Sequence, residues 1–257
     1  MPSAREPEEI YRETRREGRR RLQRPVFELA ATALVGGFDV AFGIVAFALA
    51  EQAVPGNATR LVGAVAFGIG FVFIVVGRSE LFTENFLIPV AGLERDRLAS
   101  WVKLGEPWAV ALVLNILGGA LLAVILTTHG VLPSGTGRPL VKLAEHIGDY
   151  STLTAFVSAL VAGALMTLMT WFVEGAADSL GVRIVMAWIT GALILLGTFN
   201  HAIVSTLELV FGMRYGANID VSQLLANLGL AVLGNLIGGL LFVTFVRSIQ
   251  AAEGGPA

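Results

Sequence analysis

Six long apolar segments dominate this chain, and each is long enough to cross a lipid bilayer. They lie at roughly residues 26–50, 60–92, 106–127, 152–174, 184–213 and 223–247. A helix needs about 20 apolar residues to span the hydrocarbon core. Only 15% of the residues are charged, whereas soluble proteins carry about 25%. The sequence therefore predicts an all-α, polytopic membrane protein with six transmembrane helices.

The second and fifth segments are longer than one span requires, and polar residues interrupt both of them. The interruptions lie at residues 77–85 and 198–205. Lipid offers no hydrogen-bond partner to an open backbone or to a carboxylate, so such breaks must line a space enclosed by protein. A long segment with a central break is typical of a discontinuous transmembrane helix. We therefore expect the second and fifth helices to be broken.

A short pattern in the third segment recurs in the sixth segment, 120 residues later. The two copies of this Asn-x-x-Gly-Gly pattern are Asn115, Gly118 and Gly119, and Asn235, Gly238 and Gly239. Paired glycines let helix backbones approach closely, so these residues are predicted to pack helices together. Three spans in each half would insert the halves in opposite directions, which predicts two inverted three-helix repeats.

The basic residues set the expected orientation. With the N-terminus inside, thirteen Lys and Arg residues fall on the inner side and four fall in the outer connections. This excess predicts that both termini are cytoplasmic. We expect residues 1–25 to form a cytoplasmic segment, 26–248 the transmembrane domain and 249–257 a cytoplasmic tail.

The N-terminal segment carries eight arginines within its first 24 residues, and these alternate with glutamates. Mixed charge at helical spacing predicts a solvated helix near the lipid headgroups. We favour a topology signal over a nucleic-acid or partner site. The apolar segment that follows ends in Ala48-Leu49-Ala50, like a signal-peptidase site. It is too long for a signal peptide, so it is expected to be retained.

Several chemistries are excluded or unsupported by the residue pattern. The chain has no cysteine, which removes thiolate metal sites and disulfides. No H-E-x-x-H motif or nucleophile elbow occurs, so an enzyme is not expected. His129 and His146 lie in the connection at 128–150 and are interpreted as solvated rather than as metal ligands. We expect no metal and no cofactor. The breaks also lack the Asn-Pro-Ala sequence of a water channel.

The first break and the glycine pairs resemble the formate/nitrite transporter family. Gly77 is followed by Glu80-Leu81-Phe82-Thr83, as in the family's first break, and the second break keeps Phe199 and His201. The resemblance covers roughly residues 26–247. It implies six spans with broken second and fifth helices, an inner-membrane location and a homopentamer with one pore in each protomer.

The chain departs from the family pattern at several positions. Asn200 replaces the acidic residue before the central histidine, and Ala202 and Ser205 replace the polar residues after it. The fourth helix has Gly163 where the family has a polar residue. Lys142 is the candidate to replace a lysine of the outer vestibule. These departures indicate a divergent branch, so formate or nitrite is not assumed as the substrate.

The resemblance implies that His201 shares a proton with a small monovalent anion, which then passes the constriction as a neutral weak acid. Thr83 is expected opposite His201, with Asn200 and Ser205 also on the substrate pathway. Desolvating an anion is prohibitive, whereas a histidine titrates near neutrality. The N-termini of the half-helices would also favour anions.

Two further groups of residues complete the predicted site. Leu81, Phe82 and Phe199 are expected to form the constriction, and Glu80 and Arg78 to form an ion pair that holds the first break. The partners are therefore a small anion or weak acid and the bilayer, with no nucleic acid. The alternative is a closed-pore or neutral-solute member of the same fold with a structural or regulatory role, because the second break has lost several polar groups.

Overall fold

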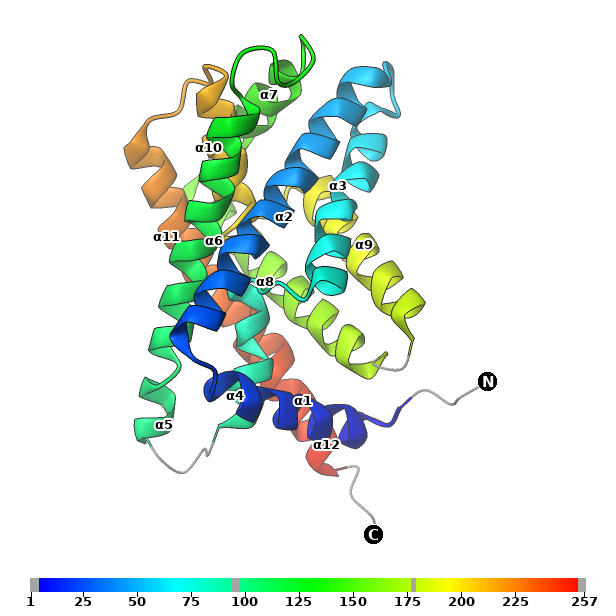
Figure 1. Ribbon diagram of the computed structural model, residues 1–257, viewed down its shortest axis with the longest axis vertical. Coiled ribbons are helices and arrows are strands. Elements are labelled where there is room, and N and C mark those ends of the chain that lie inside the picture. Colours follow the sequence, from blue (N-terminus) through cyan, green and yellow to red (C-terminus); the bar gives the residue numbers. More distant parts are fainter. Residues whose placement is uncertain (1–4, 94–97, 177–178, 254–257) are drawn as a thin grey trace.

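The computed structural model describes residues 5–93, 98–176 and 179–253, and within these ranges every regular element is helical. Five helical stretches there are long and apolar enough to cross a membrane (Figure 1). They are Val26–Ala53, Thr59–Gly77, Ser100–Leu126, Thr152–Gly175 and Val221–Ala252. A further apolar helix, α9 (Leu180–Leu196), has only 17 residues. The predicted all-α membrane fold is confirmed, and the count of six spans stays a prediction.

The polar interruptions break the helices where the sequence places them. In the first break, α3 (Thr59–Gly77) ends, and a 3₁₀ helix, η1 (Phe82–Phe86), and the short α4 (Ile88–Gly92) follow. In the second break, α9 ends and α10 (Val204–Arg214) begins. Arg78 and Thr198, 120 residues apart, both leave their helices with a positive φ, of 56° and 49°. Non-glycine residues seldom adopt this conformation.

The remaining long helices pack in pairs around these breaks. α2 (Val26–Ala53) lies against α3 and α6 (Gly105–Leu126), and α8 (Thr152–Gly175) lies against α11 (Val221–Gly239). Close contact requires small residues, because a Cβ at Gly37 would overlap the carbonyl oxygen of Asn115. A Cβ at Gly163 would likewise overlap that of Asn235. Gly163 therefore serves helix packing, which explains the missing polar side chain there.

The connection between α6 and α8 contains a helix that its turn-forming residues did not predict. α7 (Gly137–Gly148) packs against α10. Its buried residues include Leu140, Leu143, Ala144 and Ile147, which repeat at the spacing of one helix face. The turn-forming residues at 133–136 precede this helix instead of continuing through the connection.

The N-terminal helix α1 (Pro7–Leu22) is docked on the protein rather than free in solvent. It crosses one end of the bundle beside α4 and α12 (Val246–Glu253), and α7 lies at the other end (Figure 1). Ile10, Thr14 and Gly18 form its buried face. A Cβ at Gly18 would overlap the carbonyl oxygen of Ile88 in α4. Helix α1 and the segment after the first break thus touch backbone to backbone.

Replacing Gly18 with alanine is expected to undock α1. Alanine favours an isolated helix over glycine by about 1 kcal/mol, but its Cβ has no room against α4. Trypsin should then cleave the α1 arginines several-fold faster in the purified protein. Gly181→Ala is the matched control, because no atom lies within 4 Å of a Cβ added there. Equal cleavage rates in wild type and Gly18→Ala would contradict the docking.

Candidate functional site

The two breaks meet at a contact between a threonine and a histidine. Thr83 lies in η1 after the first break, and His201 lies in the second break. The Oγ1 of Thr83 is 2.9 Å from the Nε2 of His201. Both residues are fully buried. The structure therefore brings together the two residues that the sequence predicts to face each other.

The start of α10 fixes which ring nitrogen of His201 carries a proton. The Nδ1 atom accepts hydrogen bonds from the backbone N–H groups of Ile203, at 3.3 Å, and Val204, at 3.1 Å. These are the amides of the N-cap residue and of the first residue of α10, a position where N–H groups have no partner within the helix. A nitrogen that accepts cannot carry a proton in the neutral ring. We therefore assign the proton to Nε2, which donates to Thr83.

The repeated asparagines hold the two breaks in the same way. In the first break, Asn115 accepts from the N–H of Phe82 at 2.9 Å and donates to the carbonyl of Glu80 at 2.9 Å. In the second, Asn235 accepts from the N–H of Ala202 at 2.8 Å and donates to the carbonyl of Asn200 at 2.9 Å. Every atom pair is matched at a spacing of 120 residues, which supports the predicted internal repeat.

Each asparagine also ties its break to a neighbouring helix. Asn115 donates to the carbonyl of Ala33 in α2, at 2.6 Å, and Asn235 donates to that of Ala159 in α8, at 2.8 Å. The sequence predicts these asparagines only as helix-packing residues. Their amides instead satisfy backbone groups that lipid could not satisfy.

Asn235→Asp is expected to destabilise the fold by at least about 2 kcal/mol, because two buried carbonyls lose their donor and face an oxygen instead. The readout is thermal unfolding of the purified protein in detergent. Asn115→Asp should have an effect of similar size if the two breaks are equivalent. Asn218→Asp is the control, because Asn218 is exposed. A decrease no larger than that of the control would show that the asparagines do not hold the breaks.

The other predicted pathway residues have different surroundings. The side chain of Asn200 is turned to α8 and α11, where it exchanges hydrogen bonds with Asn227 and donates to the carbonyl of Ala155. Ser205 accepts from the backbone N–H of His201 at 3.1 Å, and its hydroxyl also bonds to Glu208. Asn200 thus supports the second break from behind, and Ser205 lies within it.

The predicted constriction residues are apolar and mostly buried. Leu81 and Phe82 precede Thr83 directly and are both buried, whereas Phe199 is half-buried. Phe82 lies edge-on to Phe86, with ring centroids 5.0 Å apart. Edge-on aromatic contacts of this kind are favourable and restrict ring position. The first break therefore presents a rigid apolar wall next to the threonine.

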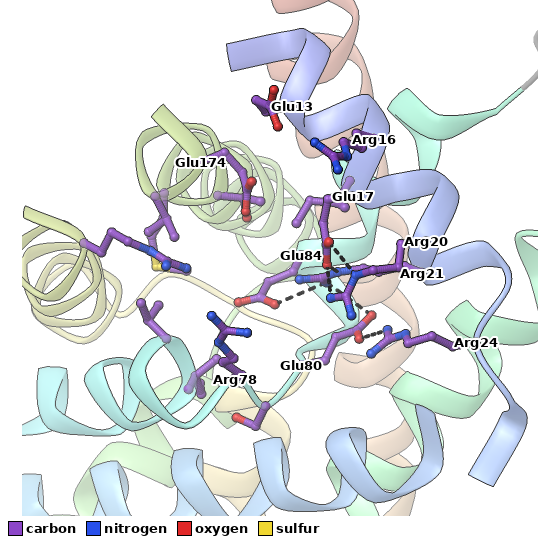
Figure 2. Close-up of a pocket in the computed structure, with 18 of the residues that line it drawn as sticks. Glu13, Arg16, Glu17, Arg20, Arg21, Arg24, Arg78, Glu80, Glu84 and Glu174 are labelled. Atoms are coloured by element: carbon purple, nitrogen blue, oxygen red, sulfur yellow. Dashed lines mark hydrogen bonds and ion pairs between the residues drawn. The ribbon is translucent and has the colours of Figure 1, made fainter. Parts of the chain in front are cut away.

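The ion pairs at the first break differ from the prediction. Glu80 does not pair with Arg78; it pairs with Arg24 and, at 3.4 Å, with Arg21. Arg21 also lies 3.8 Å from Glu84, and Figure 2 shows it between these carboxylates. Arg78, which leaves α3 with a positive φ, is exposed and makes no ion pair with a described residue. The N-terminal helix, rather than the break itself, supplies the cations.

The charges of α1 are stabilised by this arrangement. Burial disfavours the charge of Arg21, but Glu80, Glu84 and Glu17 outweigh burial and raise the pKa of its guanidinium. Burial likewise opposes the charge of Glu17, but hydrogen bonds from Arg20 and Arg21 hold its pKa below the ordinary value. Both groups are therefore ionised at neutral pH. One feature of the sequence indicates this network. Glu80 and Glu84 lie within an apolar segment, where a carboxylate needs a cationic partner.

Two pockets open at opposite ends of the bundle. The pocket at the α1 end has a volume of about 590 Å³ and is lined by Glu80, Glu84 and α1. The pocket at the α7 end has a volume of about 280 Å³, and its lining includes Arg60, Lys142 and His146. Lys142 is therefore a pocket-lining residue, and its role as a vestibule lysine stays a prediction. Neither pocket is lined by Thr83 or His201.

The α7 end supports the second break with side chains that sequence reasoning missed. Arg60 in α3 donates to the carbonyl of Leu196, at 3.2 Å, and to the hydroxyl of Thr198. Tyr150 donates to the carbonyl of Thr198 at 2.8 Å. No cluster of three or more His, Asp and Glu residues that could bind a metal occurs in the described parts of the chain.

The fold and the breaks agree with a comparison of the whole sequence. A family model described as formate/nitrite transporter matches residues 8–249. This chain belongs to the formate/nitrite transporter family. The recognition based on the first break and the paired glycines is confirmed, and the chain is a multi-pass membrane protein.

One relative and two solved structures are similar to this chain over most of its length. It is 25% identical to the inner membrane protein YfdC of Escherichia coli, over 94% of this chain and 76% of YfdC. A solved FNT family ion channel has a TM-score of 0.79 and 17% identity, over 94% of this chain and 96% of that one. A pentameric formate channel with formate bound has a TM-score of 0.72 and 22% identity, over 87% and 96%.

Proposed function

We propose that this protein is a membrane channel or transporter for small monovalent anions, or their neutral weak acids, of the formate and nitrite kind. The observation that carries the proposal is the buried Thr83–His201 contact, which joins the two helix breaks. Polar, titratable groups inside a membrane are costly and typically mark a transport pathway. The family assignment supports transport rather than catalysis.

In this proposal, His201 lends a proton at the constriction. Its Nε2–H is aimed at Thr83 and is the one ring proton in the neutral form, because Nδ1 accepts from α10. An arriving anion takes the place of the threonine oxygen and shares this proton. Sharing reduces the charge that must leave water, and an anion cannot otherwise cross an apolar constriction.

The neighbouring residues have assigned roles in the same proposal. Leu81, Phe82 and Phe199 form the dry constriction that excludes hydrated ions. Ser205 holds the backbone of His201, and Asn200 holds the break against α8 and α11. The pathway continues to the two pockets, where Lys142 and Arg60 on one side and the α1 arginines on the other attract anions.

The location and assembly follow the relatives. We place the protein in the inner membrane, as the name of its Escherichia coli relative indicates. The excess of basic residues in the connections on the side of the N-terminus supports a cytoplasmic position for both termini. A homopentamer is proposed from the pentameric formate channel that shares the fold.

A second candidate is a closed-pore member of the family with a structural or regulatory role. It is favoured by the full burial of His201 and by two pockets that both stop short of it. A channel with this structure must move the constriction residues before a solute can pass. The two candidates differ in one observable, the flux of small solutes through the reconstituted protein.

His201→Gln is the sharpest test of proton sharing, because glutamine keeps an N–H donor but does not titrate. Weak-acid flux into proteoliposomes should increase at acidic pH in the wild type. The variant should be slower at every pH, by about tenfold for roughly 1.4 kcal/mol of lost stabilisation, because an amide N–H cannot transfer its proton to the anion as an imidazole can.

Two outcomes of the flux experiment would contradict the proposal. Equal flux in wild type and His201→Gln from pH 5 to 8 would remove the role of the histidine. No flux of any small solute in either protein would favour the closed-pore candidate. His129→Gln serves as the control, because His129 is exposed and lines neither pocket.

Thr83→Val tests the acceptor of the pair without changing its volume much. Loss of one buried hydrogen bond costs about 0.5–1.5 kcal/mol, so flux should fall by roughly two- to tenfold if the hydroxyl orients His201 or the substrate. Thr190→Val is matched to it, because Thr190 is buried and its hydroxyl donates to the carbonyl of Met186 in its own helix. Equal flux in both variants would separate Thr83 from transport.

A further inference from the structure

The pocket beside α1, which we call the α1 chamber, is larger than the proposed substrate requires. Its volume is about 590 Å³, and sites for drug-sized molecules span about 300–1,000 Å³. A formate-sized anion would fill a small part of it. Arginines from α1 and its flanking residues, from the end of α3 and from α9 line its wall, namely Arg5, Arg16, Arg20, Arg21, Arg24, Arg78 and Arg183.

The carboxylates of the chamber satisfy only some of these arginines. Glu80 is bound by Arg21 and Arg24, and Glu17 by Arg20 and Arg21. Arg78 makes no hydrogen bond or ion pair with any described residue, and Figure 2 shows its guanidinium pointing into the chamber. Arg78 therefore lines the chamber as a cation that no carboxylate of the described structure neutralises.

A buried donor without a partner adds a second, independent observation. The Nε of Arg183, at the start of α9, is buried and has no hydrogen-bond partner in the described structure. The same is true of the Nε of Arg24 on the other side of the chamber. A buried donor left unsatisfied costs about 1–3 kcal/mol, so such atoms usually have a water or ligand partner.

We propose that the α1 chamber binds a phosphate-bearing ligand, with the phosphate held by Arg78 and Arg183. The planar guanidinium matches phosphate oxygens with two parallel N–H bonds. Glu174 and Glu84 line the same chamber and accept hydrogen bonds from hydroxyl or amino groups on the rest of the ligand. A phosphate ester can contact both the arginines and the glutamates of the chamber, whereas a bare monovalent anion offers Glu174 and Glu84 no hydrogen-bond donor.

A ligand at this position also obstructs transport, and this part rests on the proposed function. Glu80 and Glu84 line the chamber and flank Leu81 to Thr83 in the chain. A molecule that fills the chamber therefore stands directly before the first break.

Binding is tested on the purified full-length protein with inorganic pyrophosphate as the probe. A ligand that binds only the folded state raises the unfolding temperature. We expect pyrophosphate to raise it by several degrees, and the Arg78→Gln/Arg183→Gln double variant to weaken the apparent affinity at least tenfold. Arg138→Gln, an exposed arginine on α7, should behave as wild type. No shift, or an equal shift in the double variant, would overturn the proposal.

Measurements in lipid vesicles decide whether the bound phosphate belongs to a lipid headgroup or to a soluble phosphate ester. The thermal measurement is repeated in phosphatidylcholine alone and with added phosphatidylglycerol. Stabilisation by phosphatidylglycerol that the double variant loses supports a lipid headgroup as the ligand. Stabilisation by pyrophosphate in phosphatidylcholine alone supports a soluble phosphate ester.

A flux measurement with pyrophosphate added to one side of the membrane separates this inference from the proposed function. Pyrophosphate on the α1 side should slow weak-acid flux in the wild type, and the same concentration on the α7 side should not. The double variant should resist inhibition. Absence of all flux would remove the proposed transport while the thermal shift still decides binding. Binding without inhibition from the α1 side would contradict obstruction.

Discussion

The need to satisfy open backbone in a membrane controls the rest of this structure. Each helix break exposes amide and carbonyl groups where lipid offers no partner, and each unsatisfied group costs several kcal/mol. Asn115 and Asn235 meet this need with one amide apiece, by accepting and donating at the same positions of the two breaks. Only because the breaks are held in this way can polar side chains be placed inside the bundle.

The two breaks are held alike but carry different chemistry. Leu81 and His201 are equivalent at the 120-residue spacing, yet one is an apolar wall residue and the other is an imidazole. The second break is supported by Arg60, Tyr150 and Asn227, which bond to the uncharged hydroxyl and carbonyl of Thr198 and the amide of Asn200. The first break is closed by ion pairs from α1. Duplication therefore explains the frame of the site, and divergence explains its chemistry.

The sequence predicts the breaks and the Thr83–His201 pair because both features are local or depend on motifs. It does not predict the ion pairs of Glu80, since Arg21 and Arg24 lie more than 50 residues away and belong to a segment with many similar arginines. The sequence also does not predict the docking of α1, because the close contact depends on Gly18, and a glycine has no side chain that would mark a buried helix face. The sequence does not predict α7 either, because the turn-forming residues at 133–136 indicate a loop. The apolar residues with helical spacing come only after them, at 140–147.

The position of His201 at the start of α10 limits the chemistry available to it. Protonation at Nδ1 would turn an acceptor of two backbone amides into a donor facing them, so it would require the first turn of α10 to move. The neutral ring with a proton on Nε2 is the form that the surrounding backbone stabilises. A histidine held in this way offers one proton in one direction, toward Thr83. Selectivity for an anion then follows from the direction of that N–H, together with the dry wall of Leu81 and Phe82, rather than from a permanent charge.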